Sequence, residues 1–290
     1  MGSLLDDTLN AALEAVWPTR CVGCERPGEL LCDQCAANLP YIDPRWACPR
    51  CGAPFGWLVC SECLTTEGPA ELAYSAGVSV LEFRDAAARM VVAYKDKDER
   101  RLAGVLAGLL ARALPRGWLA WADALTWIPC DRKARERRGF DHMAELAEIL
   151  AGQTGRAAIS LLHKKEVGDQ RKLNRQEREE NIRASFSVDS AAVAALIESV
   201  AASSSSRATN PVSPMPTSAA TPTNPVSPMP ASAATPTNPG RSTHATSPRA
   251  PHLILLDDVL TTGATLHAAA SVLLQAGVGE IRVATLARVW

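Results

Sequence analysis

The sequence is poor in aromatic residues and carries almost no net charge. Aromatic side chains make up 5% of its 290 residues, and 30 basic residues against 31 acidic ones leave a formal net charge of -1. Single-stranded nucleic acids bind basic grooves lined by aromatic side chains, and anionic membranes attract basic proteins. The composition therefore provides no general attraction to either partner, so any anion site must be local.

Long apolar runs and a basic leader are also missing. No stretch approaches the ~18 apolar residues that a membrane-spanning helix needs. The first residues, MGSLLDDTLNAALEAVW, include Asp6, Asp7 and Glu14 but no basic residue, whereas a secretory signal begins with a positively charged region. We therefore expect a cytoplasmic protein with no membrane partner.

Cysteine is abundant and regularly spaced. Eight of the nine cysteines form four CxxC pairs: Cys21/Cys24, Cys32/Cys35, Cys48/Cys51 and Cys60/Cys63. A CxxC turn presents two thiolates on one side, and two such turns complete a tetrahedral shell of sulfurs around zinc. Disulfides and redox dithiols are the alternatives, but neither explains four repeated pairs in a reducing compartment. The pairs predict two structural zinc ions, because a closed shell leaves no position for a substrate.

The spacing of the pairs allows two ligation patterns. In the sequential pattern, which we prefer, the first pair joins the second and the third joins the fourth; in the other, the pairs are interleaved. The ninth cysteine, Cys130, stands apart. It is more typical of a small buried residue than of a nucleophile.

The rest of the chain alternates strand-like and helix-like segments. Strands are predicted at 73–83, 124–128, 252–256 and 281–287, and helical apolar stripes at 83–94, 102–113, 143–150 and 265–276. This alternation predicts an α/β fold with a parallel sheet covered on both faces. Residues 4–16 add a short amphipathic helix, which we expect to pack on the following module.

The composition changes between residues 191 and 250, where Ser, Thr, Ala and Pro dominate. A fourteen-residue unit occurs twice, at 209–222 and 223–236. Dense proline is incompatible with helix and sheet, and little apolar surface is present to offset the entropy of ordering. Because the sheet pattern resumes afterwards, we predict a disordered insertion over 191–250 within one domain. The expected domains are residues 1–66, which contain the zinc module, and residues 67–290.

The sharpest chemical signal is the segment LILLDDVLTTGATL at 253–266. A buried strand leads to Asp257 and Asp258, and a Thr/Gly loop then opens a helix. Free amides at a helix N-terminus suit a phosphate, and Gly263 lets the backbone approach it. The hydroxyl donors of the loop are Thr261, Thr262 and Thr265. Carboxylates do not suit phosphate, so we assign the two acids to vicinal hydroxyls of a sugar phosphate. The alternative is a merely capped turn, for which one polar residue would suffice.

The order D-D-V-x-T-T-G-A-T at 257–265 resembles the phosphoribosyl pyrophosphate signature of type I phosphoribosyltransferases. With four CxxC pairs ahead of it, the chain resembles the ComF family, competence-associated proteins that join a double zinc ribbon to such a domain. The resemblance implies binding of phosphoribosyl pyrophosphate or another ribose phosphate with Mg2+, with Asp257 and Asp258 as catalytic residues at the ribose and its metal. The ligand-binding residues that it implies are Val259, Thr261, Thr262, Gly263, Ala264 and Thr265.

A second segment, IPCDR at 128–132 followed by Arg138-Gly139-Phe140, resembles the pyrophosphate-side loop of the family. The resemblance places Asp131, Arg132 and Arg138 near pyrophosphate. Asp141 and His142 stand where the family has Asn and Gln. The local basic cluster is a suitable anion site, and a solvated helix start or a nucleic-acid patch is the alternative. The cluster comprises Arg132, Lys133, Arg135, Arg137 and Arg138.

A third segment resembles the flexible loop of the family, with Val167 where Thr is common. Its matching residues are Gln170, Leu173, Arg178, Asn181 and Phe186. We expect residues 163–183 to close over the site as a lid.

Three functions remain as hypotheses. The first is a phosphoribosyltransferase of unknown acceptor, which would act by placement, charge stabilisation and exclusion of water. The second, implied by the resemblance, is a non-catalytic nucleotide sensor or single-stranded-DNA-handling factor whose zinc ribbons dock a competence helicase. A zinc-dependent redox protein is a third possibility and would need exchangeable thiols.

Overall fold

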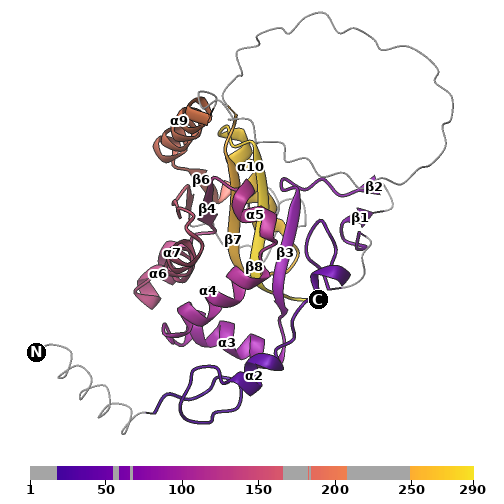
Figure 1. Cartoon of the computed structure of the whole chain (residues 1–290), viewed down its shortest axis with the longest axis vertical. Helices are drawn as coiled ribbons and strands as arrows, with labels where there is room; N and C mark the ends of the chain where they lie inside the picture. Colours follow the sequence, from indigo (N-terminus) through magenta and orange to yellow (C-terminus); the bar gives the residue numbers. More distant parts are fainter. Residues whose placement is uncertain (1–17, 55–58, 66–67, 166–181, 183, 208–248) are drawn as a thin grey trace, which may run out of the picture.

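The computed structural model describes residues 18–54, 59–65, 68–165, 182, 184–207 and 249–290. Within these ranges, two small cysteine-rich modules lie against an α/β domain (Figure 1). None of the helices in these ranges is long and apolar enough to cross a membrane. The expected helix at 4–16, the repeats at 209–236 and most of the expected lid lie outside the described residues.

The α/β domain is built on a four-stranded parallel sheet. In spatial order the strands are β3 (Ala76–Glu82), β8 (Glu280–Arg288), β7 (His252–Leu260) and β4 (Ala124–Trp127). The two central strands are mostly apolar and mostly buried, as is typical of parallel strands that are covered on both faces. The prediction of a parallel sheet covered on both faces is confirmed, although β7 runs four residues beyond the predicted end at 256.

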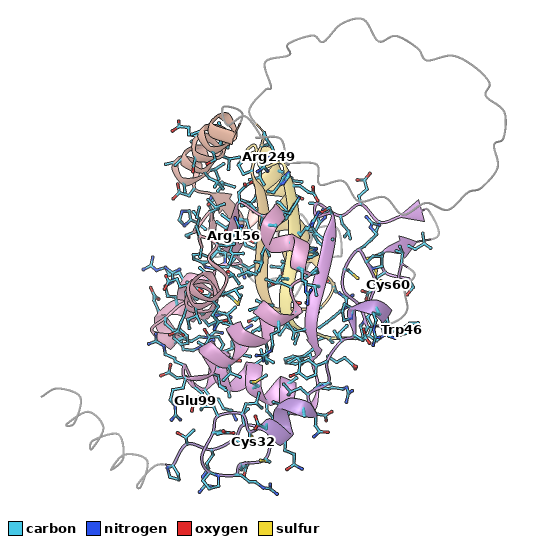
Figure 2. All side chains as sticks on the ribbon, in the orientation of Figure 1. Cys32, Trp46, Cys60, Glu99, Arg156 and Arg249 are labelled. Carbon is cyan, nitrogen blue, oxygen red and sulfur yellow. The ribbon has the colours of Figure 1, made fainter. Side chains whose placement is uncertain are left out.

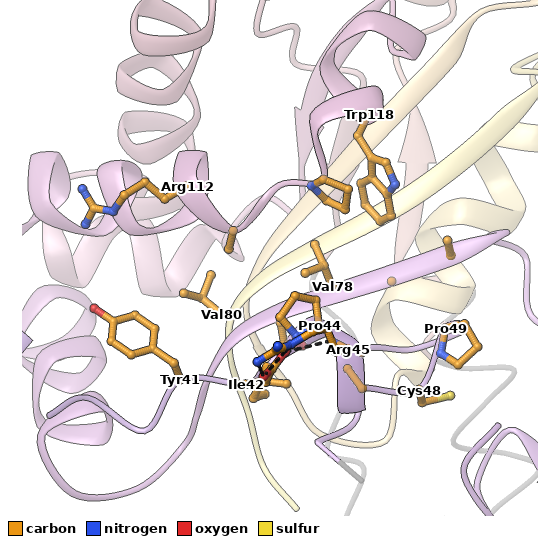
Figure 3. A pocket seen from close by; sticks show the side chains of 18 of the residues that line it. Tyr41, Ile42, Pro44, Arg45, Cys48, Pro49, Val78, Val80, Arg112 and Trp118 are labelled. Atoms are coloured by element: carbon orange, nitrogen blue, oxygen red, sulfur yellow. Dashed lines mark hydrogen bonds and ion pairs between the residues drawn. The ribbon is translucent and has the colours of Figure 1, made fainter. Parts of the chain in front are cut away.

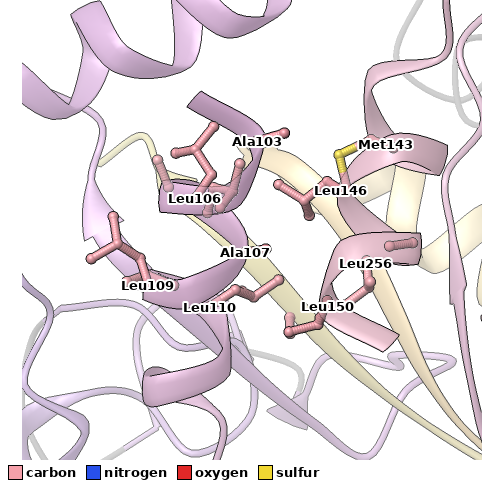
Figure 4. Close-up of a cluster of buried hydrophobic side chains, with 14 of the residues drawn as sticks. Ala103, Leu106, Ala107, Leu109, Leu110, Met143, Leu146, Leu150 and Leu256 are labelled. Atoms are coloured by element: carbon pink, nitrogen blue, oxygen red, sulfur yellow. The ribbon is translucent and has the colours of Figure 1, made fainter. Parts of the chain in front are cut away.

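Helices cover each face of the sheet. One face is covered by α3 (Asp85–Asp96), α4 (Leu102–Ala113) and α7 (His142–Thr154). The other face is covered by α9 (Ser190–Arg207) and α10 (Ala264–Gln275). Beside these two helices lies the hairpin of β5 (Leu162–Lys164) and β6 (Phe186–Val188). Figure 4 shows Leu106 and Leu110 of α4 packed with Leu146 and Leu150 of α7. Alternate residues of β7 enter the two cores, with Leu256 on this side and Leu255 on the other.

Helix α9 corrects one prediction. Residues 191–207 were assigned to a disordered insertion, but Ser190–Arg207 is a helix whose Val193, Leu196 and Val200 are buried against the second core. The segment is rich in alanine, which is the strongest helix former, and it precedes the proline-rich repeats. The predicted start of the insertion, residue 191, is therefore wrong, because the prediction groups alanine with the residues that disfavour helix.

The cysteine-rich modules contain little regular structure. They hold α2 (Asp33–Ala37), the 3-10 helix η1 (Pro44–Trp46) and the short hairpin of β1 (Leu64–Thr65) and β2 (Gly68–Pro69). The predicted domain boundary at 66/67 falls between the two strands, outside the described residues.

Both outer strands of the sheet are paired on their open side. Beside β3, the Ile42 amide donates to the Val80 carbonyl at 3.0 Å, and the Glu82 amide donates to the Pro40 carbonyl at 2.9 Å. Beside β4, the Leu125 amide donates to the Ala157 carbonyl at 2.8 Å. The chain between the two cysteine-rich modules thus serves as an extra edge for the sheet.

Candidate functional site

The two aspartates lie inside β7, at its carboxyl end. Asp257 is opposite Thr285 of β8 in the parallel register, so the strand continues through the acid pair to Leu260. Because consecutive residues of a strand point to opposite faces, the two carboxylates diverge. Asp258 lies on the face covered by α3 and α7, and Asp257 on the other.

Asp258 is buried and heavily hydrogen-bonded. Its Oδ2 accepts from Lys95 Nζ at 2.5 Å and from His142 Nε2 at 2.8 Å, while its Oδ1 accepts from the Val259 amide at 2.7 Å. Burial acts to raise the pKa of Asp258, but His142 and Lys95 outweigh it and hold this pKa well below its usual range. Asp258 is therefore an anion that fixes two side chains at the carboxyl end of the sheet.

His142 links Asp258 to a basic residue of the R-G-F segment. Arg138 Nη1 lies 3.3 Å from His142 Nδ1, and Arg138 Nη2 donates to Asp96 Oδ1 at 3.1 Å. A neutral imidazole with its proton on Nε2 satisfies both neighbours, since it donates to Asp258 and accepts from Arg138. This chain of contacts brings the end of α3 and the start of α7 to the acid pair.

Asp257 retains a free acceptor among the described residues. Its Oδ1 accepts from the Asp258 amide at 2.9 Å, whereas no described residue donates to its Oδ2. Burial, followed by the charge of Asp258, raises the pKa of Asp257 to about 8, against the opposing influence of Lys95 and Lys164. Near neutral pH Asp257 is therefore the member of the acid pair that holds a proton, and Asp258 is the ionised member.

The loop after β7 has the geometry of an anion site. Gly263 has a φ of +79°, which favours glycine, and α10 begins at the next residue. No side chain caps this helix, so its first amides are left without an intrahelical acceptor. Thr261 and Thr262 are exposed at the loop. The alternative of a merely capped turn is weakened, because among the described residues the first amide of the helix, that of Ala264, donates only a long hydrogen bond to Thr262 Oγ1, at 3.4 Å.

The residues expected at pyrophosphate are not all brought to this site. Asp131 caps α6 (Arg132–Arg138) by accepting from the Ala134 amide at 2.7 Å, and Arg132 pairs with Glu136 at 2.7 Å on an exposed face. Arg138 alone reaches the acid pair, through His142. Cys130 is partly buried, and burial raises the pKa of its thiol, as suits a residue that is not a nucleophile.

Two residues that contact Asp258 are not indicated as site residues by the sequence pattern. Lys95 belongs to no motif, and His142 is only a departure from the family pattern. Lys95 lies at the polar end of an otherwise apolar helical stripe, where a solvated lysine is the ordinary expectation. Only the packing of α3 and α7 on one face of the sheet brings both side chains to Asp258.

The eight paired cysteines form two clusters that fit zinc. The outer zinc site comprises Cys21, Cys24, Cys32 and Cys35, and the inner zinc site comprises Cys48, Cys51, Cys60 and Cys63; within each, the sulfurs lie within 4.8 Å of one another. The preferred sequential ligation is thus confirmed. Figure 2 shows Cys32 of the outer site near α3 and Cys60 of the inner site beside β3. Four thiolates suit a closed structural site.

In each cluster, a backbone amide stabilises the thiolate form of one cysteine. The Cys32 amide lies 3.4 Å from Cys21 Sγ, and the Cys60 amide 3.4 Å from Cys48 Sγ. Burial acts to raise both thiol pKa values, but the amides outweigh it and lower the pKa of Cys21 to about 6 and that of Cys48 to about 7. Thiolates are the form that binds zinc.

The two zinc sites are held to the α/β domain by different arginines. Arg89 of α3 donates to the Val22 and Gly23 carbonyls at 3.3 and 2.9 Å and is exposed. At the inner site, Arg288 ends β8, is 2% exposed and donates to Glu62 Oε2 at 2.6 Å and to the Cys51 carbonyl at 3.4 Å. The inner site is thus attached to the strand beside β7.

A groove of about 710 Å³ lies next to the inner zinc site (Figure 3). It is lined by the 41–49 segment, by β3 and by Arg112 and Trp118. None of its lining residues belongs to the acid pair or the Thr/Gly loop. The groove is therefore separate from the candidate ligand site.

Two family models match the chain. A double zinc ribbon domain matches residues 12–64, and a phosphoribosyl transferase domain matches residues 197–289. The first match contains both cysteine clusters, and the second contains the acid pair and the Thr/Gly loop. A comparison with curated proteins gave no match.

Proposed function

From the ComF-like architecture of this chain, a double zinc ribbon followed by a phosphoribosyltransferase domain, we propose that it binds phosphoribosyl pyrophosphate with Mg2+ and transfers its phosphoribosyl group. The observation that carries the proposal is the end of β7. There Asp257, whose Oδ2 accepts from no described residue, is followed within six residues by an uncapped helix N-terminus at Gly263. A ribose 5-phosphate offers hydroxyls and a phosphate at complementary positions.

Each part of this site has a role in the proposal. The loop from Thr261 to Thr265 binds the 5-phosphate through amides and hydroxyls, together with the flanking Val259 and Ala264. Asp257 accepts from a ribose hydroxyl. Asp258 completes the acid pair at the ribose end and holds Lys95, whose ammonium stabilises negative charge on the leaving pyrophosphate. Arg138, fixed by Asp96 and His142, adds charge on the same side; Asp131 and Arg132 form the outer part of this side.

The transfer step separates charge at one carbon. The bond between ribose C1 and pyrophosphate breaks with its electron pair leaving on pyrophosphate, and a lone pair of the acceptor forms the new bond to C1. The residues of the chain orient the ribose and stabilise the departing anion. Mg2+, which prefers oxygen ligands, would be held by Asp257 and would neutralise charge on the ligand oxygens.

Calorimetry with phosphoribosyl pyrophosphate and Mg2+ tests the proposal. Above about pH 8, where Asp257 is ionised, we expect binding by the wild type and a loss of about tenfold or more in Asp257→Asn, because a charge-assisted hydrogen bond is removed. Asp85→Asn, on an exposed helix start, serves as the matched control. Equal affinity in the wild type and Asp257→Asn would remove the site assignment. Pyrophosphate release in the same samples separates turnover from binding alone.

The raised pKa of Asp257 adds a pH dependence. Its carboxylate must lose a proton to bind Mg2+ or to accept from a hydroxyl with both oxygens, so metal-dependent affinity should rise with pH and level off above about 8. Stability should move in the opposite direction, because the folded state binds this proton more tightly than the unfolded state and loses the advantage as pH rises toward 8. Asp257→Asn should abolish both trends, and an unchanged pH profile in that variant would contradict the assignment.

The ComF-like architecture extends the proposal to DNA uptake. In this role a cytoplasmic protein would dock a competence helicase or single-stranded DNA through its zinc ribbons, and it could sense nucleotides without turnover. Binding of phosphoribosyl pyrophosphate without pyrophosphate release would favour this second function. A direct test is the affinity for a single-stranded oligonucleotide over a salt series, where contacts to phosphates give a steep loss. If the chain does not bind the oligonucleotide, or if the affinity does not change with salt, binding of single-stranded DNA is excluded.

A further inference from the structure

Tyr74 is a buried tyrosine whose hydroxyl has no hydrogen-bond partner among the described residues. The residue is 5% exposed and packs in the second core beside Leu260 and Leu266. No described residue forms a hydrogen bond with its hydroxyl. A buried tyrosine usually finds a partner for this group, because leaving it unsatisfied is unfavourable. As far as the described residues go, the Tyr74 hydroxyl is therefore left available to a ligand.

The hydroxyl lies at the Thr/Gly loop. A Cβ atom placed on Gly263 would be 3.3 Å from the Tyr74 hydroxyl oxygen, so the phenol reaches the turn that precedes α10. The neighbouring Ala73 amide donates to His267 Nδ1, one turn into this helix, at 3.1 Å. The segment that carries Tyr74 is thus fastened to the same helix whose first amides are uncapped.

We propose that the Tyr74 hydroxyl is a further ligand of the phosphate bound by the loop at 261–265, which deepens the function proposed above and rests on it. Its hydroxyl adds an O–H donor from outside the loop, on the side of Gly263. Burial raises the pKa of Tyr74 above its ordinary value, so the hydroxyl keeps its proton at neutral pH and can donate. A phosphate oxygen would supply the acceptor that none of the described residues provides.

The inner zinc site fixes the segment before Tyr74. The Ala70 amide donates to the Cys63 carbonyl at 3.0 Å, and Arg50 donates to the Cys63 and Ala70 carbonyls at 3.0 and 2.6 Å. Leu72 packs both on the cysteine cluster and on the core that contains Tyr74. The position of the hydroxyl is therefore set by the zinc ribbon, with Arg50 as a positioning residue.

The substitution Tyr74→Phe tests the proposal with ribose 5-phosphate as the probe in calorimetry. We expect affinity to fall about tenfold, as when a hydrogen bond to a charged group is lost, with an unchanged melting temperature because no hydrogen bond to a described residue is lost. Tyr41→Phe is the matched control, since Tyr41 is 44% exposed and lies away from the loop. Equal affinity in Tyr74→Phe and the wild type would overturn the proposal.

This outcome is separable from failure of the proposed function. If the wild type binds ribose 5-phosphate and Asp257→Asn weakens it while Tyr74→Phe does not, only the role of Tyr74 is wrong. If the wild type does not bind the probe, both are wrong.

The positioning role of Arg50 has its own readout. Arg50→Ala should weaken binding of ribose 5-phosphate about threefold to tenfold with the zinc content unchanged, because the segment before Tyr74 loses its clamp. In the double variant with Tyr74→Phe the losses should not add, since both act through one hydroxyl. Fully additive losses would show that Arg50 does not act through Tyr74.

Discussion

The two zinc sites have the same ligands but very different surroundings. All four cysteines of the inner site are buried, whereas in the outer site Cys21 alone is buried and Cys24 is exposed. The inner site lies against the outer edge of β3 and is bonded to the end of β8. The outer site is bonded to one face of α3. CxxC pairs of the same spacing can therefore form an exposed outer module in one case and part of the domain interior in the other.

The largest expected contrast comes from removing one ligand at each site. Cys60→Ser should lower the free energy of unfolding of the whole domain by about 5 kcal/mol, a fraction of the ~10 kcal/mol that a structural zinc site supplies, because the inner cluster packs on the sheet. Cys24→Ser should lose its zinc as well but cost the domain only about 1 kcal/mol, since an exposed module can unfold locally. Zinc content and chemical denaturation measure both quantities, and equal costs would erase the distinction.

A glycine in each module gives the next contrast. Gly52, with a φ of +73°, would place a Cβ 2.8 Å from the Ser79 amide nitrogen of β3, so Gly52→Ala combines backbone strain with a clash against backbone. Gly28, with a φ of +118°, has open space around it. We expect losses of about 3 kcal/mol for Gly52→Ala and about 1 kcal/mol for Gly28→Ala. Thermal melting of the two variants checks the order, and a larger shift for Gly28→Ala would contradict it.

The smallest contrast concerns the two arginines. Arg288→Ala removes a side chain that is 2% exposed, together with its bonds to Glu62 and Cys51, and should cost about 2 kcal/mol. Arg89→Ala removes two exposed bonds to the outer module and should cost about 0.5 kcal/mol. Urea denaturation resolves the difference. Equal losses of unfolding free energy in Arg288→Ala and Arg89→Ala would mean that the burial of Arg288 does not strengthen the attachment of the inner zinc site to β8.

The sequence predicted the order of strands and helices well, because the apolar runs are long and their periods are clear. It also predicted both cysteine clusters, since two CxxC pairs close together leave few arrangements of four sulfurs. The end of β7 was set too early because the predicted strand stopped at the first charged residue, whereas Asp257 and Asp258 continue the parallel register with β8. Helix α9 was missed because its alanines were grouped with the repeats that follow.

The candidate site was only partly predictable. The acids and the Thr/Gly loop are contiguous in sequence, so their pattern could be found there. Lys95, His142 and Tyr74 come from three distant segments, and only the packed sheet brings them to the end of β7. Two side chains bind Asp258, whereas the Oδ2 atom of Asp257 accepts from no described residue. This difference depends on three-dimensional distances, which the spacing of residues along the sequence does not give.

The strand pairing beside β3 has a consequence for self-association. An unpaired edge of a sheet is a template on which another molecule can add a strand. Here the Pro40–Ile42 segment occupies that template, and it is anchored by a zinc site on either side. Loss of zinc would free this segment and expose the edge of β3, which is seven residues long. The first sign of zinc loss should therefore be insoluble oligomers and not a soluble unfolded monomer.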